Sequence, residues 1–352
     1  MISPDSRTRK WIDQCRKNLD PELAEKMILA FMLTESLKTS GLDFIFKGGT
    51  SLSLITGNLS RFSIDVDIIV STGSVLTPYF KHIIDQGVFT RYEEDVRASD
   101  IPVKHFKFFF VSSSGNEKHI LIDILFEDDP YPHTVEEPIT SPLLQVTGDP
   151  TTVTCPTLGC LLGDKLTAFA PHTTGVQFNK DKELEIIKQL FDVATLFDYV
   201  ILANGALSGV FEAHASVAVK ELGYRKLETL TPIDVLQDTF QTSCMIGTYG
   251  KLGVMKEYEE ILSGSSKLQA YVYSGPFNFQ KTILCAAKVA CLAAAGIKRI
   301  QAIQRFDSNI DPYARLIQNR SYNRLNKVGR VGPEPYFYFC QALEILGIFD
   351  YL

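Results

Sequence analysis

Apolar residues recur with helical spacing in residues 21–38, PELAEKMILAFMLTESLK, directly after an Asp-Pro start signal. Residues 43–47, DFIFK, predict a short strand that runs into the turn Gly48-Gly49-Thr50-Ser51 and then into a helical turn or two. Residues 63–70, SIDVDIIV, alternate in polarity and predict a second strand. The same patterns predict a helix at 77–86 and strands at 88–92, 105–112 and 118–126.

The pattern changes after the turn-rich stretch 132–150, PHTVEEPITSPLLQVTGDP. Helical periodicity dominates the rest of the chain, at 158–169, 180–202, 205–222, 232–244, 252–262, 277–295 and 335–346. The sequence therefore predicts an α+β protein, with a mixed α/β sheet domain at 1–150 and a mostly helical domain at 151–352, the boundary lying between 141 and 157.

Composition bounds the class of protein. The 352 residues are 45% hydrophobic and 22% charged, which is typical of a soluble globular chain. The N-terminus is polar and no run approaches the length of a membrane span, so we expect a cytoplasmic protein without a membrane partner. Seven cysteines without C-x-x-C spacing predict reduced core thiols, and six scattered histidines without an H-x-x-x-H pair predict no zinc site.

Charge is distributed unevenly along the chain. The formal net charge is −6, yet eight basic and only two acidic residues lie between Gly296 and Gly332. Tyrosines that suit stacking on exposed bases interleave with or follow these cations: Tyr313, Tyr322, Tyr336 and Tyr338. The segment is a candidate RNA-docking face, and a solvated face is the alternative that composition leaves open.

The candidate chemistry begins with Asp65-Val66-Asp67 in the predicted strand. Side chains two apart on a strand point to the same face, so both carboxylates project together while Val66 and its apolar neighbours face the core. Two carboxylates about 4 Å apart repel by roughly 4 kcal/mol at an effective dielectric of 20. A cation is therefore expected there, and oxygen ligands favour Mg²⁺, with Mn²⁺ as the alternative.

A third carboxylate, Asp123, lies in a similar apolar context, HILIDILF. If its strand pairs beside that of Asp65, the three acids form one metal-binding cluster in which Asp123 is a ligand or the base for an attacking hydroxyl. An exposed edge-strand position is the alternative for this residue.

The glycine turn supplies a candidate phosphate site. Gly48 and Gly49 allow close approach of the backbone to a phosphate, and Thr50 and Ser51 add hydroxyl donors at a helix N-terminus. No G-x-x-x-x-G-K-[ST] sequence is present, so this is not a Walker A loop.

At this point the string FIFKGGTSLSLITGNLSRFSIDVDIIV resembles the first motif of the AbiEii/AbiGii nucleotidyltransferase toxins, K-G-G-T-x-L followed by R-F-S-x-D-[IV]-D-[LI]. That family, which is similar to MenT-type toxins, has a DNA polymerase β-like fold with an appended helical domain. The resemblance implies metal roles for Asp65 and Asp67. It also implies phosphate or supporting roles for Lys47, Gly48, Gly49, Thr50, Ser51, Arg61 and Ser63.

Two later segments resemble further family motifs. LLGDKLTAF assigns Lys165 to the phosphates of the nucleotide, and KQLFDVATL places Lys188 and Asp192 at the rim of the site. Gln189 stands where an acid is common in the family, which weakens the second match. Structural alternatives remain: an ion pair between Lys165 and Asp164, an i,i+4 pair between Lys188 and Asp192, and a loop staple for Arg61.

The resemblance implies a metal-dependent enzyme that moves a nucleoside monophosphate from an NTP to an RNA acceptor, with the tRNA 3′ end as the expected site of attachment. It implies the toxin of a toxin–antitoxin or phage-defence pair, whose antitoxin need not contact it. Transfer to a protein hydroxyl or a small molecule is one alternative, and a non-catalytic nucleotide-binding module is another. The retention of all three candidate carboxylates favours an enzyme.

Overall fold

The protein is described from a computed structural model that covers residues 1–352 except 17–19, 98–100, 203–206, 315 and 350–352. The chain divides into two units. Unit 1 consists of Met1–Thr157 and the later segment Ala270–Gly275. Unit 2 consists of Leu158–Gln269 and Pro276–Leu352, and each unit is described by itself.

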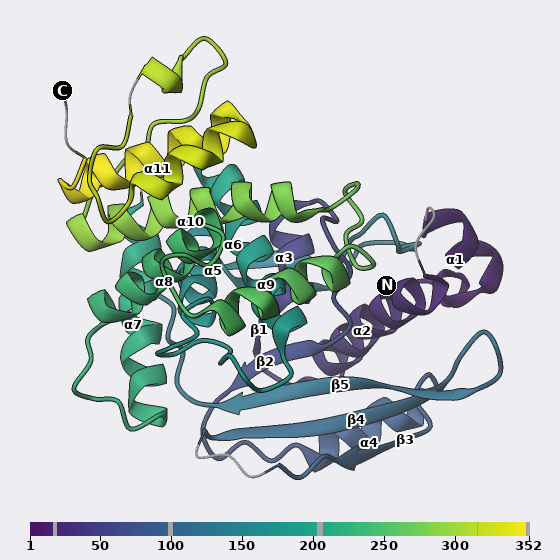
Figure 1. Ribbon diagram of the computed structural model, residues 1–352. Coiled ribbons are helices and arrows are strands. Elements are labelled where there is room, and N and C mark those ends of the chain that lie inside the picture. Colours follow the sequence, from purple (N-terminus) through teal and green to yellow (C-terminus); the bar gives the residue numbers. More distant parts are fainter. Residues whose placement is uncertain (17–19, 98–100, 203–206, 315, 350–352) are drawn as a thin grey trace. The chain divides into compact units, whose positions relative to one another are not determined.

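Unit 1 is built on a seven-stranded mixed sheet with the order β3-β4-β5-β2-β1-β7-β6 (Figure 1). The strands are β1 Ile45–Lys47, β2 Val66–Val70, β3 Arg91–Glu94, β4 Val103–Val111, β5 Glu117–Phe126, β6 Thr134–Pro138 and β7 Thr152–Pro156. Strand β2 pairs parallel with β5 and antiparallel with β1. The strand that carries Asp67 thus lies at the middle of the sheet.

The helices of unit 1 are η1 Pro4–Arg7, α1 Arg9–Cys15, α2 Pro21–Thr39, α3 Gly48–Thr56 and α4 Thr77–Asp85. Helix α2 packs against β2, β5 and α4. The core on this side is apolar and aromatic, because Phe80 of α4 meets Phe106 and Phe108 of β4 edge to face at centroid distances of 5.0 Å. Because successive side chains along β4 and β5 point to opposite faces of the sheet, the face turned away from this aromatic core is left for polar residues.

Three boundaries differ from the sequence expectation. Strand β2 begins at Val66, so Asp65 lies immediately before it and not inside it. The strand expected at 88–92 is shifted to Arg91–Glu94. Strand β7 pairs with β1 and β6 beyond residue 150, and the unit boundary falls after Thr157. Short elements such as β7 carry little periodicity of their own and depend on their partners.

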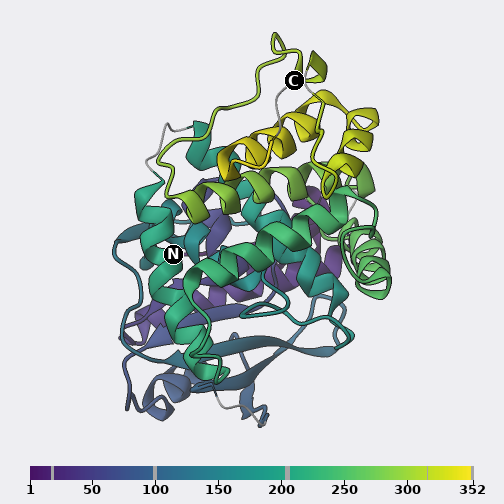
Figure 2. The same cartoon turned by 60° about the vertical axis from the view of Figure 1, so that its left-hand side comes forward.

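Unit 2 is helical in the part that the structure describes. Its helices are α5 Leu158–Ala168, α6 Glu183–Leu202, α7 Ser208–Tyr224, α8 Pro232–Gly247, α9 Met255–Leu268, α10 Phe279–Lys298 and α11 Pro333–Leu346, with 3₁₀ helices η2 Pro312–Ala314 and η3 Asn323–Arg330. Helix α10 packs against α6, α8 and α11, and Figures 1 and 2 both show α10 and α11 side by side.

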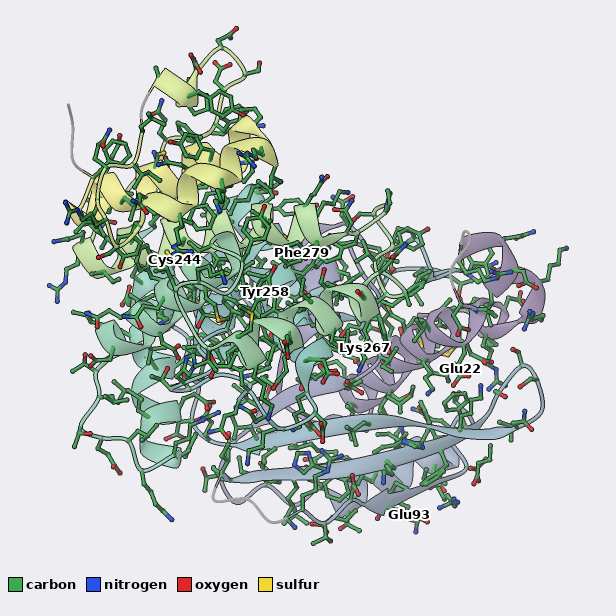
Figure 3. All side chains as sticks on the ribbon, viewed as in Figure 1. Glu22, Glu93, Cys244, Tyr258, Lys267 and Phe279 are labelled. Atoms are coloured by element: carbon green, nitrogen blue, oxygen red, sulfur yellow. The ribbon has the colours of Figure 1, made fainter. Side chains whose placement is uncertain are left out.

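Helix α10 is the central element of unit 2. By length and composition it is apolar enough to cross a membrane, which differs from the expectation that no segment approaches that length. However, 72% of its most apolar window is buried inside the protein, as in the core helix of a helical domain. Its first residue, Phe279, meets Tyr258 of α9 edge to face at 5.9 Å, and both are marked in Figure 3.

The cysteines are free thiols, as the sequence predicts. Five of them are buried, including Cys244 on α8 (Figure 3). Burial raises the pKa of Cys285 to about 12, so its thiol is protonated and unreactive near neutral pH.

A cluster of one histidine and two acids, His172 with Asp238 and Glu257, holds the segment that follows α5. The Nδ1 atom of His172 lies 2.7 Å from Asp238 Oδ1 on α8, and its Nε2 atom lies 3.2 Å from Glu257 Oε2 on α9. The backbone N–H of His172 also donates to Asp238, at 2.8 Å. The hydrogen bond to Asp238, with a smaller contribution from Glu257, raises the pKa of His172 to about 9.

This cluster predicts a pH-dependent stability. Below pH 6.5 the folded and unfolded chains both carry protonated His172, whereas between pH 6.5 and 9 only the folded chain does. Stability from the cluster is therefore full below pH 6.5 and is lost as the pH rises to 9. We expect His172→Gln to remove about 1 kcal/mol at pH 6, because a half-exposed pair is screened by solvent, and much less at pH 9.

Urea unfolding of unit 2 at pH 6 and pH 9 measures this difference. The exposed His133 of unit 1 offers a control, and His133→Gln should leave the pH dependence unchanged. Equal destabilisation by His172→Gln at both pH values would contradict the electrostatic account.

Candidate active site

Four polar residues form one row across one face of the central strands. Lys47 of β1 lies opposite Asp67 of β2, Asp67 lies opposite Asp123 of β5, and Asp123 lies opposite His105 of β4. Directly opposed residues on neighbouring strands point to the same side of a sheet. The register thus brings Asp67 and Asp123 together, with a basic residue at each end of the row.

The two carboxylates are the electrostatic centre of this row. Opposed like charges destabilise a sheet, whereas the same pair becomes favourable around a cation. Asp123 Oδ1 lies 2.6 Å from His105 Nδ1, and the Asp123 side chain is 30% exposed. The hydrogen bond orients one oxygen of Asp123, and the side chain retains surface for a further contact.

Gly48 places the glycine turn directly against Asp67. Its φ is +81°, in the region that favours glycine, and it begins helix α3 at the end of β1. A Cβ at this position would lie 2.0 Å from Asp67 Oδ2, so only glycine fits beside the carboxylate. The start of α3 and the Asp67 carboxylate are therefore in contact, as a joint phosphate and metal site requires.

Gly49 makes a second close approach, to the loop that precedes β2. A Cβ at Gly49 would lie 2.7 Å from Arg61 Nη2 and 2.7 Å from Ser63 Oγ. Arg61 is buried at 7% exposure, and its Nη1 donates to the carbonyl oxygen of Phe62 at 2.9 Å. Arg61 and Ser63 thus pack over the first turn of α3.

A segment distant in sequence holds this loop in place. The backbone N–H of Phe62 donates to the carbonyl of Tyr271 at 2.8 Å, and that of Tyr273 donates to the carbonyl of Ser60 at 2.8 Å. The Phe62 and Tyr273 rings also meet edge to face at 5.7 Å. These contacts explain why residues 270–275 belong to unit 1.

Thr50 and Ser51 are buried within the first turn of α3. Thr50 Oγ1 donates to the carbonyl of Asp65 at 2.6 Å, and Ser51 Oγ donates to the carbonyl of Gly48 at 3.1 Å. Both hydroxyl protons are therefore used by backbone acceptors, which differs from their expected role as phosphate donors. Thr50 instead connects α3 to Asp65. Phosphate binding at this turn stays a prediction, and it rests on the backbone N–H groups of the helix start.

Unit 2 carries a second group of predicted site residues. Lys165 of α5 is 6% exposed, and its Nζ lies 3.0 Å from Gln189 Oε1 and 3.0 Å from Asp192 Oδ2 on α6. Asp192 is 1% exposed. The partner of Lys165 that the structure reveals is thus Asp192, and Gln189 supplies a neutral oxygen ligand where the family commonly has an acid.

Lys188 lies on the same helix, α6, and is 8% exposed. Its Nζ donates to Glu185 Oε1 at 2.9 Å, one turn earlier. Long cationic side chains with little exposure are costly unless acids accompany them, and Lys165 and Lys188 each have such a companion.

Two residues near these groups were not identified from the sequence. His105 alternates with Phe106 and Phe108 along β4, but only the register with β5 reveals that it faces Asp123. Gln189 was noted only as a departure from the family pattern. Its contact with Lys165 depends on the packing of α5 against α6, which no local pattern encodes.

The donor chemistry fits a divalent cation. Asp67 and Asp123 are adjacent, oxygen-rich and next to a helix start, and Mg²⁺ in proteins is usually held by one or two carboxylates with substrate phosphates and water. Among the described residues, no three His, Cys, Asp or Glu side chains are arranged as a complete metal site. A metal bound here would therefore take its remaining ligands from the phosphates of a bound nucleotide and from water.

Comparison with known proteins identifies the class and then the family. The profile of the family described as "Nucleotidyl transferase AbiEii toxin, Type IV TA system" matches residues 31–241. The match spans more than half of the chain and includes both groups of predicted site residues. The chain belongs to this family, as its resemblance predicts, and is a nucleotidyltransferase toxin of a type IV toxin–antitoxin system.

Solved structures with similarity to the chain have low identity. MenT4, a nucleotidyltransferase toxin from Mycobacterium tuberculosis H37Rv, shares 14% identity with a TM-score of 0.43 over 91% of this chain and 99% of its own. An antigenic nucleotidyltransferase-like protein from Paracoccidioides brasiliensis shares 11% identity with a TM-score of 0.35 over 59% of this chain and 93% of its own. A search of curated proteins found no match.

The contact between Gly48 and Asp67 yields a prediction with an internal control. Gly48→Ala places a methyl group onto the Asp67 carboxylate and should abolish nucleotidyl transfer. Gly57→Ala, at the other end of α3, has a similar positive φ of +64° but open space around its Cβ. Both variants should lose about 1–2 kcal/mol of stability through backbone strain.

Only Gly48→Ala should also lose activity. Thermal unfolding and a transfer assay on both variants separate the two effects. Retained transfer by Gly48→Ala would show that the Asp67 position is unimportant.

Proposed function

We propose that this protein transfers a nucleoside monophosphate from an NTP to an RNA acceptor, with the tRNA 3′ end as the favoured acceptor. The observation that carries the proposal is the juxtaposition of Asp67, Asp123 and the glycine turn at Gly48 in the middle of the sheet. Family membership supports the reaction class. We further propose that the toxin acts in the cytoplasm, in toxin–antitoxin or phage-defence control, with an antitoxin that need not contact it.

The bonds that change define what the residues must do. The oxygen of an acceptor hydroxyl forms a bond to the α-phosphorus of the NTP, and the bond from that phosphorus to the bridging oxygen breaks. Pyrophosphate departs with the electron pair, and Asp123 is the candidate acceptor for the hydroxyl proton. Since little covalent work falls to the protein, positioning and charge stabilisation dominate the catalysis.

Asp67 and Asp123 would hold the divalent cation, Mg²⁺ or Mn²⁺, and the family motif assigns Asp65 to the same cation. When bound, the cation neutralises phosphate charge and activates the attacking oxygen. The first turn of α3 would bind phosphate through its backbone N–H groups, and Lys47 lies opposite Asp67 to add positive charge. His105 orients Asp123 through its 2.6 Å hydrogen bond. The phosphate roles of Lys165 and Lys188 rest on the family motifs.

The direct test uses purified protein, each α-labelled NTP in turn, Mg²⁺ and total tRNA. Label should enter RNA with one preferred NTP, and Asp65→Asn and Asp67→Asn should reduce it by on the order of 100-fold or more, since charge stabilisation at a transferring phosphoryl group is lost. Asp85→Asn is the control, because Asp85 is an exposed acid at the end of α4.

The location of the label decides between acceptors. Label on RNA from the wild type and Asp85→Asn alone supports the proposal. Label on the protein itself or on a small molecule would contradict the RNA acceptor while leaving the chemistry intact. Equal labelling by the Asp65 and Asp67 variants would place the chemistry elsewhere.

A further inference from the structure

The 3₁₀ helix η3, Asn323–Arg330, sorts its residues into three columns. Side chains three apart are eclipsed in a 3₁₀ helix, because the helix has three residues per turn. One column, Leu325 and Val328, is fully buried. A Cβ on Gly247 of α8 would lie 2.8 Å from Leu325 Cδ2, so this column packs into the core of unit 2.

The second column attaches η3 to the preceding segment. Asn326 accepts from the backbone N–H of Ile317 at 3.0 Å, donates to the carbonyl of Ile317 at 3.0 Å, and accepts from the hydroxyl of Tyr336 at 2.8 Å. Gly329 accepts from the hydroxyl of Tyr313 at 3.0 Å. The rotation of η3 about its axis is therefore fixed on two sides.

The third column consists only of cations. Arg324, Lys327 and Arg330 are exposed, and with the other two columns engaged they project together away from the core. Successive members are separated by about 6 Å along the axis, from three residues at about 2 Å rise each. Among the described residues none of the three has a carboxylate partner, although the chain as a whole has a net charge of −6.

An aromatic ring lies beside this column. Tyr313 stacks on Tyr336 at a centroid distance of 5.7 Å and an interplanar angle of 14°. Tyr336 is buried at 1% exposure, whereas Tyr313 remains 47% exposed. The ring is thus held flat against the core and next to Gly329, in the same turn as Arg330. One acid, Asp311, is nearby and accepts from the backbone N–H of Tyr313 at 2.9 Å.

Of the four tyrosines that the sequence suggested for base stacking, the structure leaves only Tyr313 exposed among those described. Tyr336 and Tyr338 are buried, and Tyr322 packs against Phe240 at 6.0 Å. Of the basic residues in the segment, Arg315 lies outside the described residues. Lys298, Arg299, Arg305 and Arg320 are exposed as well. Arg324, Lys327 and Arg330 differ from them because they form one column of a single helix beside the exposed ring of Tyr313.

We propose that Arg324, Lys327, Arg330 and Tyr313 form a docking site for a single-stranded stretch of nucleic acid, with the cations along the phosphates and a base stacked on Tyr313. Cation rows that follow a backbone, combined with exposed aromatic rings, are how proteins bind single strands without reading sequence. An acidic peptide would use the cations but would gain little from a flat exposed ring. The choice of RNA as the bound strand rests on the proposed function. The site would give the RNA acceptor a binding surface on unit 2.

Binding of a fluorescent single-stranded RNA oligonucleotide, measured by anisotropy without NTP over a range of salt concentrations, tests the site. The triple variant Arg324→Gln, Lys327→Gln, Arg330→Gln should bind at least about tenfold more weakly at low salt. The slope of log affinity against log salt concentration should be smaller in magnitude by about 2. Each phosphate contact to a single strand contributes about 0.7 to this slope, and the variant loses three contacts.

The matched control removes three exposed lysines elsewhere in unit 2, through Lys251→Gln, Lys256→Gln and Lys281→Gln. It changes the net charge equally and should leave the affinity and slope close to wild type. Equal weakening by the two triple variants would mean that charge acts non-specifically, and it would overturn the site.

Tyr313 has its own pair of variants. Tyr313→Leu should weaken binding about tenfold without changing the salt slope, because stacking is lost but no phosphate contact is. Tyr313→Phe keeps the ring and should bind like wild type. Equal affinity for Tyr313→Leu and wild type would remove the ring from the site.

These results separate the docking site from the catalytic proposal. A protein that binds RNA through the cation column but labels no RNA would contradict the RNA-transfer proposal alone. A protein that labels RNA while its η3 triple variant binds RNA with unchanged affinity and slope would contradict the docking site alone.

Discussion

Asp67 and Asp123 are side by side on the two central strands of the sheet, and the repulsion between their carboxylates constrains everything around them. Two acids at this spacing are unfavourable without nearby positive charge. Lys47 supplies positive charge at one end of the row, His105 forms a hydrogen bond with Asp123 at the other end, and the start of α3 lies against Asp67. These surroundings combine carboxylate oxygens with a helix N-terminus, which is the donor chemistry that suits a divalent cation and a phosphate.

The second constraint is the precision with which α3 meets the sheet. Gly48 and Gly49 are in contact with a carboxylate and with the Arg61 loop, respectively, at distances that exclude any side chain. The loop itself is held by two backbone hydrogen bonds: the carbonyl of Tyr271 accepts from the N–H of Phe62, and the N–H of Tyr273 donates to the carbonyl of Ser60. A segment far along the chain thus stabilises the geometry of the catalytic region, so variants at 271–273 can impair it without approaching the substrate.

Much of this arrangement is encoded locally, and some is not. Helical periodicity locates α2 and α5–α11 because each buries an apolar face, and most bounds agree within about three residues, although α9 ends six residues beyond the expected 262. The K-G-G-T and D-V-D strings identify the family, which the profile match confirms. By contrast, the pairing of Asp123 with His105, the partner of Lys165 and strand β7 depend on which elements become neighbours. The column of cations on η3 was visible only as excess charge, since 3₁₀ geometry has no clear sequence pattern.

The central claim, that Asp67 and Asp123 share a divalent cation, is tested most directly by thermal unfolding of wild type and Asp123→Asn in a chelator and in Mg²⁺. We predict that Mg²⁺ raises the unfolding temperature of the wild type but not of the variant. In the chelator the variant should be at least as stable as the wild type, because a repulsion has been removed. An equal Mg²⁺ shift in both proteins, or a loss of stability by the variant in the chelator, would contradict the account.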